Sequence, residues 1–191
     1  LGPFRDLVAA ARAQRASRGI RHLRDTRAMS AAPVNPRAAN VLMALTYAVA
    51  ALGIGLAFST LSDTPPTLGL AALCAVGGGG ILSFVRHAVF HRADAERIGW
   101  TSERTNAFQI EVGLANLAWG VYAVLAVALG WGLAAESAGF LIFGLYMGAV
   151  GVFEVISSRG ENARPWTQVI PSIAFAAMLL YIGFRGMGAA G

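Results

Sequence analysis

The sequence is poor in charge: only 13% of its 191 residues are Asp, Glu, Lys or Arg, and none is lysine. Cysteine occurs once, at Cys74. A single cysteine excludes an intramolecular disulfide and any cysteine-rich metal or iron–sulfur site. A hydrophobic fraction of 56% in so weakly charged a chain is instead typical of a membrane protein.

Most of these apolar residues fall in long blocks. About 20 apolar residues in a helix cross roughly 30 Å of hydrocarbon. The blocks are too continuous for the alternating strands of a membrane barrel, so we expect helices, whose backbone hydrogen bonds are satisfied internally. The sequence predicts an all-α, polytopic transmembrane helical bundle, a single domain over residues 39–191, with spans at 40–61, 68–90, 107–129, 139–157 and 166–184.

The arginines are distributed unevenly around the predicted spans. Eight precede the first span, four lie at the end of the second span or between it and the third, and two lie between the fourth and fifth, whereas only Arg185 falls on the opposite side. Basic residues are retained on the cytoplasmic side of a membrane. The fourteen-to-one division predicts a multi-pass protein of the bacterial cytoplasmic (inner) membrane, with its amino terminus inside and its carboxyl terminus outside.

Residues 1–38 form a basic tail. From Arg12 to Arg27 an arginine recurs at every third position, so these charges wind around any helix, because each step of three residues drifts by about 60°. We expect a disordered arm that touches anionic lipid headgroups or a partner protein, while nucleic-acid binding has no aromatic support. Alternatively, residues 1–28 are an upstream extension before Met29. The candidate contact residues are Arg12, Arg15, Arg18, Arg21, Arg24 and Arg27.

Histidines and carboxylates gather near the predicted cytoplasmic ends of the second, third and fourth spans. If the second helix continues past residue 90, His87, His91 and Asp94 share one face, and Glu111 is expected to point towards them from the third span. Ionisable groups at a span are candidates for a functional site. The predicted polar pocket comprises His87, His91, Asp94, Gln109, Glu111, Asn116 and Glu154.

Two chemical interpretations of this pocket compete with a purely structural one. Imidazoles with nearby carboxylates are ligands for zinc, iron or manganese, and His87, His91, Asp94 and Glu111 are the candidate metal ligands. The same groups are also suited to a proton relay or to binding a polar substrate. The structural interpretation places the histidines at headgroup level and pairs the acids with arginines.

Several short motifs around the third span carry a family resemblance. They are Ile98-Gly99-Trp100, Phe108-Gln109-Ile110-Glu111-Val112-Gly113 and Ala115-Asn116-Leu117-Ala118-Trp119-Gly120. Together with His87 and His91 they resemble, over about residues 80–158, a bacterial family of small multi-pass membrane proteins known as domain of unknown function 6790. The resemblance implies a membrane bundle of four or five helices and no stated activity. It also implies a histidine near the end of the fourth span, where this chain has Glu154.

Three classes of function remain open on the sequence alone. The first, which small size and glycine-rich packing faces favour, is a non-catalytic accessory or assembly subunit of a larger membrane complex, bound to other subunits or to itself. The second is a membrane-embedded metal or redox enzyme that uses the histidine and carboxylate cluster. The third is a transporter or channel, for which five helices would have to oligomerise.

The arginine distribution makes the topology testable. Reporter fusions at Ser137 and after Gly191 should both report the outer side of the membrane, because both sites follow an odd number of crossings from a cytoplasmic amino terminus. A cytoplasmic signal at Gly191 with an outer signal at Ser137 would show that the last segment, which contains Pro171, does not cross.

Overall fold

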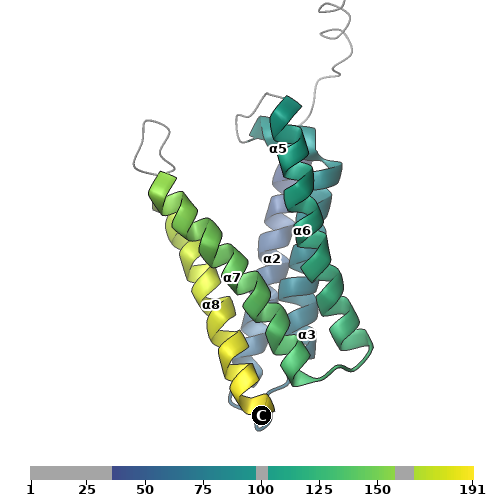
Figure 1. The fold of residues 1–191 in the computed structure, drawn as a ribbon, viewed down its shortest axis with the longest axis vertical. Coiled ribbons are helices and arrows are strands. Elements are labelled where there is room, and N and C mark those ends of the chain that lie inside the picture. Colours follow the sequence, from purple (N-terminus) through teal and green to yellow (C-terminus); the bar gives the residue numbers. More distant parts are fainter. Residues whose placement is uncertain (1–35, 98–102, 158–165) are drawn as a thin grey trace, which may run out of the picture. The chain divides into compact units, whose positions relative to one another are not determined.

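The computed structural model describes residues 36–97, 103–157 and 166–191. All regular elements in these ranges are helical, and five of the helices, taking α3 to η2 as one, are long and apolar enough to cross a membrane (Figure 1). The elements are α2 (Arg37–Thr60), α3 (Gly69–Ala72), η1 (Leu73–Gly78), α4 (Gly79–Phe84), η2 (Val85–Val89), α5 (His91–Arg97), α6 (Glu103–Ala128), α7 (Leu133–Ser157) and α8 (Trp166–Ala190).

The predicted fold class is therefore confirmed, and the chain is a multi-pass membrane protein. The first three spans end within a few residues of their predicted limits. The fourth starts earlier than predicted, at Leu133, because Glu136 is accommodated in the first turn of α7, where a negative charge favours the helix dipole. Pro171 lies inside α8, which continues to Ala190. The predicted basic tail falls mostly on residues 1–35, outside the described residues.

The second span is not a uniform α-helix. It consists of α3, η1, α4 and η2 in succession, and η1 and η2 are wider π-helical turns in which hydrogen bonds join residues five apart. η1 covers Gly77 and Gly78, so this glycine-rich stretch remains helical. π-Helical turns change which residues share a face, and η2 contains both Arg86 and His87.

Glycine allows three helices to approach one another closely. A Cβ atom added to Gly53 of α2 would lie 2.7 Å from Cβ of Ala75 in η1. A Cβ atom added to Gly80 of α4 would lie 2.6 Å from the carbonyl oxygen of Asn116 in α6. Both distances are too short for any side chain, so these contacts require glycine and draw α2, α6 and the second span into one core.

The α7–α8 pair joins this core through aromatic and aliphatic side chains. Trp119 of α6 packs on Tyr146 and Phe143 of α7, with ring centroids 4.6 Å and 5.8 Å apart. Phe140 and Leu179 are fully buried in the same cluster as Ala75 and Val76. Figure 1 shows α5 and the first turn of α6 at one end of the helices, and the turn between α6 and α7 at the other end with the carboxyl terminus.

The glycine contact between α2 and η1 yields a matched pair of variants. Gly53→Ala should destabilise the protein by about 1–3 kcal/mol, because the added methyl group overlaps Ala75. Gly55→Ala on the same helix should have no such cost, since nothing lies within 4 Å of its added Cβ atom. The free energy of unfolding of each variant is measured by denaturing it in detergent and monitoring the loss of its helical circular-dichroism signal. Equal destabilisation by the two substitutions would contradict the close contact.

Candidate functional site

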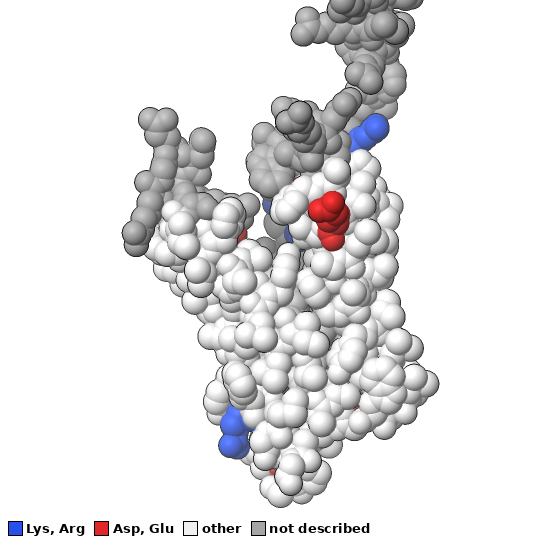
Figure 2. Space-filling model, viewed as in Figure 1, with Lys and Arg blue, Asp and Glu red and all other residues white. Residues whose placement is uncertain are grey.

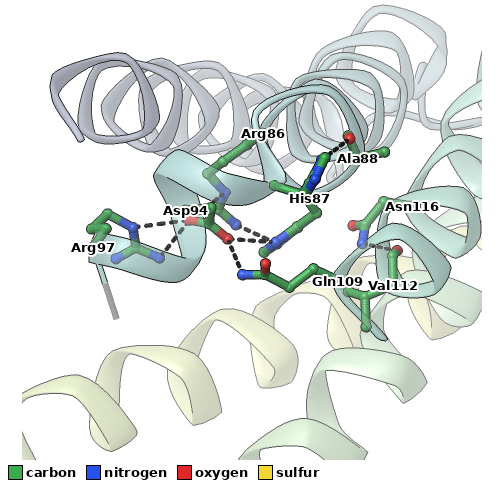
Figure 3. A network of polar contacts seen from close by, with 9 residues as sticks. Arg86, His87, Ala88, Asp94, Arg97, Gln109, Val112 and Asn116 are labelled. Carbon is green, nitrogen blue, oxygen red and sulfur yellow. Dashed lines mark hydrogen bonds and ion pairs between the residues drawn. The ribbon is translucent and has the colours of Figure 1, made fainter. Parts of the chain in front are cut away.

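A fully buried carboxylate, Asp94, lies at the centre of a polar network at the end of the helices where α5 lies (Figure 3). Its side chain is only 1% exposed. A buried charge is costly unless oppositely charged or hydrogen-bonding groups surround it. Four side chains from three elements meet this requirement: Arg86 and His87 from η2, Arg97 from α5 and Gln109 from α6.

Asp94 makes two contacts with Arg97 of its own helix. Both Nε and Nη2 of this guanidinium lie 2.9 Å from Oδ1, and Nε donates a hydrogen bond to it. The amide of Gln109 donates to the other oxygen, Oδ2, at 3.3 Å. Charge-assisted bonds of this kind are stronger than bonds between neutral groups. Asp94 thereby connects α5 to α6.

His87 and Arg86 complete the network from η2. Arg86 donates from Nη2 to Nε2 of His87 at 2.8 Å. Because a guanidinium has only donors, Nε2 must be unprotonated, which places the ring proton on Nδ1. Nδ1 lies 2.8 Å from Oδ2 of Asp94, although its N–H is not aligned with this oxygen as a linear hydrogen bond would be. Nε of Arg86 lies 3.9 Å from Oδ1.

The local backbone explains how these groups meet. The π turn of η2 ends where the backbone N–H of Phe90 donates to the carbonyl of Val85. Phe90 then leaves helical geometry, with φ −98° and ψ 27°, and α5 starts in a new direction. This change of direction brings Asp94 of α5 back over Arg86 and His87.

The network changes the acidity of Asp94. Burial alone would raise its pKa, but the contact with His87 and the positive charges of Arg86 and Arg97 more than offset this effect and hold the pKa below its usual value. The carboxylate is therefore ionised at neutral pH, and its charge is compensated within the fold.

Part of the predicted pocket is brought together. His87 and Gln109 both contact Asp94. The expectation for His91 was wrong: its Nδ1 faces the carbonyl oxygen of Ala88 at 2.9 Å, because the helix breaks at Phe90 and residues 87, 91 and 94 do not share a regular face. A uniform rotation of about 100° per residue does not hold across a π turn and a break.

The prediction that Glu111 faces the bundle interior was also wrong. Glu111 is exposed on α6, whereas Gln109 and Gly113 on the same helix are buried. Small residues on the opposite face of α6 determine which side packs against the second span. Glu111 therefore points away from the network around Asp94.

The other two candidates are buried but separate from Asp94. Asn116 donates to the carbonyl of Val112 in its own helix at 2.7 Å, instead of to another helix. Glu154 is buried on α7, and the contacts of Asp94 do not include it. Of the candidate metal ligands, His87 and Asp94 are in contact, whereas His91 and Glu111 do not join them. The described residues contain no group of three or more metal-ligating side chains.

The predicted pocket did not include Arg86 and Arg97, although the structural interpretation paired the acids with arginines in general. Arg97 lies three residues after Asp94, a spacing at which oppositely charged side chains on a helix meet. That signal was present in the sequence. No comparable spacing connects Arg86 with Asp94, because their contact depends on the break at Phe90.

Comparison with known proteins places the chain in one family. The model of the family of unknown function DUF6790 matches residues 36–184, and the chain belongs to this family. The match starts next to the first described helix, covers the first four spans and includes most of the fifth. No curated protein and no solved structure matches the chain. The family resemblance noted in the sequence is thereby confirmed.

The network predicts that Asp94→Asn is strongly destabilising. Asparagine keeps the shape but leaves Arg86 and Arg97 without their buried counter-charge, which should cost about 3 kcal/mol at neutral pH. Glu96→Gln is the matched control, because Glu96 is exposed on the same short helix. Thermal unfolding in detergent measures both variants.

The pH dependence of this loss has a definite sign. The pKa of Asp94 is lower in the folded protein than in the unfolded chain, where it is about 3.9. The stabilisation is therefore complete above about pH 5 and is lost as the pH falls below about 4 towards the folded pKa. The difference between wild type and Asp94→Asn should narrow over that range. A constant difference down to low pH would contradict the proposed charge compensation.

Proposed function

We propose that this protein is a non-catalytic accessory subunit of a larger complex in the bacterial cytoplasmic membrane, with its amino terminus inside. The observation that carries the proposal is the saturation of Asp94. Each of its oxygens already faces donors from the chain itself, supplied by Arg86, His87, Arg97 and Gln109. A carboxylate surrounded in this way stabilises a fold and has little capacity left to bind a metal or substrate.

The arrangement of the network supports the same conclusion. A catalytic acid or base needs access to a reacting group and a pKa near the working pH. Asp94 is buried, and its pKa is held below the usual value by fixed partners. The contacts join η2, α5 and α6, so their effect is to fix the end of the second span against its neighbours.

The close helix contacts also suit a scaffold. Gly53 and Gly80 bring three helices together at distances that leave no room for a side chain. Such packing gives a rigid bundle whose outer faces are available for other subunits and for lipid. The arginines of the tail would then contact anionic headgroups or a neighbouring subunit.

The proposal predicts that the protein is found in a complex. An affinity-tagged chain, expressed at its natural level and extracted from native membranes in mild detergent, should migrate on a native gel in a particle of defined mass that contains other membrane proteins. Deleting the chain should lower the amount of that particle severalfold, because an assembly subunit stabilises its partners.

Metal analysis provides the discriminating control. Stoichiometric metal that is lost in His87→Ala, together with migration as a single chain, would contradict the accessory role and support the enzyme interpretation. Unchanged levels of every membrane protein after deletion of the chain would also contradict the proposal.

A further inference from the structure

Glu111 is an acidic side chain on the outer surface of a membrane-spanning helix. It lies four residues after Ala107, where the apolar span of α6 begins, which places it about 6 Å inside the span. The residue is exposed, and among the described residues it has no ion pair and no hydrogen bond. A carboxylate in this position is unfavourable against lipid alone, and such groups normally have a partner.

The same side of α6 carries a continuous apolar surface below Glu111. Its members recur at intervals of three and four residues, which places them on one side of the helix. We call this surface the Glu111 face. It comprises Glu111, Leu114, Ala118, Val121 and Leu125, all of them exposed. The view in Figure 2 shows how little charge the bundle surface carries between its two ends, so an exposed acid there is conspicuous.

The opposite side of α6 is already used inside the bundle. A Cβ atom on Gly113 would lie 2.9 Å from Cβ of Ala88, and one on Gly120 would lie 3.1 Å from the backbone nitrogen of Ile81. The helix is therefore fixed by its small residues against the second span. Its orientation, with Glu111 outward, follows from this packing.

We propose that the Glu111 face docks a transmembrane helix of a different subunit, which carries an arginine or lysine opposite Glu111. This inference rests on the accessory role proposed above and names the surface that performs it. Charge complementarity identifies the occupant. Membrane proteins retain basic residues at the cytoplasmic ends of their spans. The arginine distribution of this chain places Glu111 near the same side of the membrane. Ala118, in the middle of the face, permits close approach of the two backbones.

A second copy of this chain fits the same surface poorly. Two copies in one membrane have the same orientation, so a two-fold contact between their α6 helices would bring the two Glu111 side chains to the same depth, near the symmetry axis. Like charges at such a position repel each other. A basic side chain on a different partner would instead attract the Glu111 carboxylate.

Site-specific photo-crosslinking tests the inference in native membranes. A photo-reactive amino acid at Leu114 or Val121 should crosslink to one membrane protein, at a segment with an arginine or lysine within a turn of its cytoplasmic end. Leu145 on α7 is the control site, since it is 63% exposed on another helix. Glu111→Gln should lower the crosslink about three- to tenfold, and Glu111→Lys by at least about tenfold.

A charge-reversal experiment on both partners is the decisive test. Replacing the basic residue of the captured helix with glutamate should restore the crosslink in the Glu111→Lys variant. Because Glu111 is exposed, its variants should melt in detergent at the same temperature as the wild type, which separates loss of docking from loss of fold.

Several outcomes would overturn the inference. They are crosslinks from Leu114 to lipid alone, crosslinks to a second copy, equal yield from Leu145, and insensitivity to Glu111→Lys. If the native complex persists while only Leu145 crosslinks, the accessory role stands and the Glu111 face is not the docking surface. If no complex is found, both proposals fail.

Discussion

The buried negative charge of Asp94 must be compensated, and this requirement fixes how η2, α5 and α6 meet at one end of the helices. Asp94 has essentially no contact with solvent, and without counter-charges its burial would oppose folding. Arg86 and Arg97 supply these charges from η2 and α5, and Gln109 adds a hydrogen bond from α6. Each element must therefore be in its correct place before the carboxylate is satisfied. The network specifies an arrangement of helices as well as stabilising it.

This electrostatic requirement depends in turn on close packing between backbones. Gln109 reaches Asp94 only because α6 lies against η2, and that approach occurs at Gly113, whose added Cβ atom would overlap Ala88. Ala88 directly follows His87 in the chain. A larger residue at position 113 would move α6 outward and lengthen the contact between Gln109 and Asp94. The small residues of the membrane core thus set the distances on which the polar site relies.

Length and hydropathy were sufficient to predict that there are five spans. A helix that crosses a bilayer is recognised by its own number of apolar residues, without knowledge of the helices that pack against it. The site was only partly predictable. His91 was misplaced because the prediction assumed a regular helix, and neither the π turn of η2 nor the break at Phe90 has a clear signature in the residue types. Glu111 was misplaced for another reason. Its orientation follows from Gly113 and Asn116, which mark the packed side of α6.

Asp94 and Glu111 are similar carboxylates that differ in their surroundings, and this difference determines what each of them does. Asp94 is enclosed by donors of its own chain, so its charge contributes to folding. Glu111 lies two residues after Gln109 on the same helix, a rotation of about 200°, and this rotation removes it from the network that Gln109 joins. Among the described residues no side chain pairs with Glu111, and a carboxylate in a span is stabilised by water, by headgroups or by a basic group. The two sides of α6 therefore differ in role, because Gln109 contributes to the buried polar network while Glu111 faces outward.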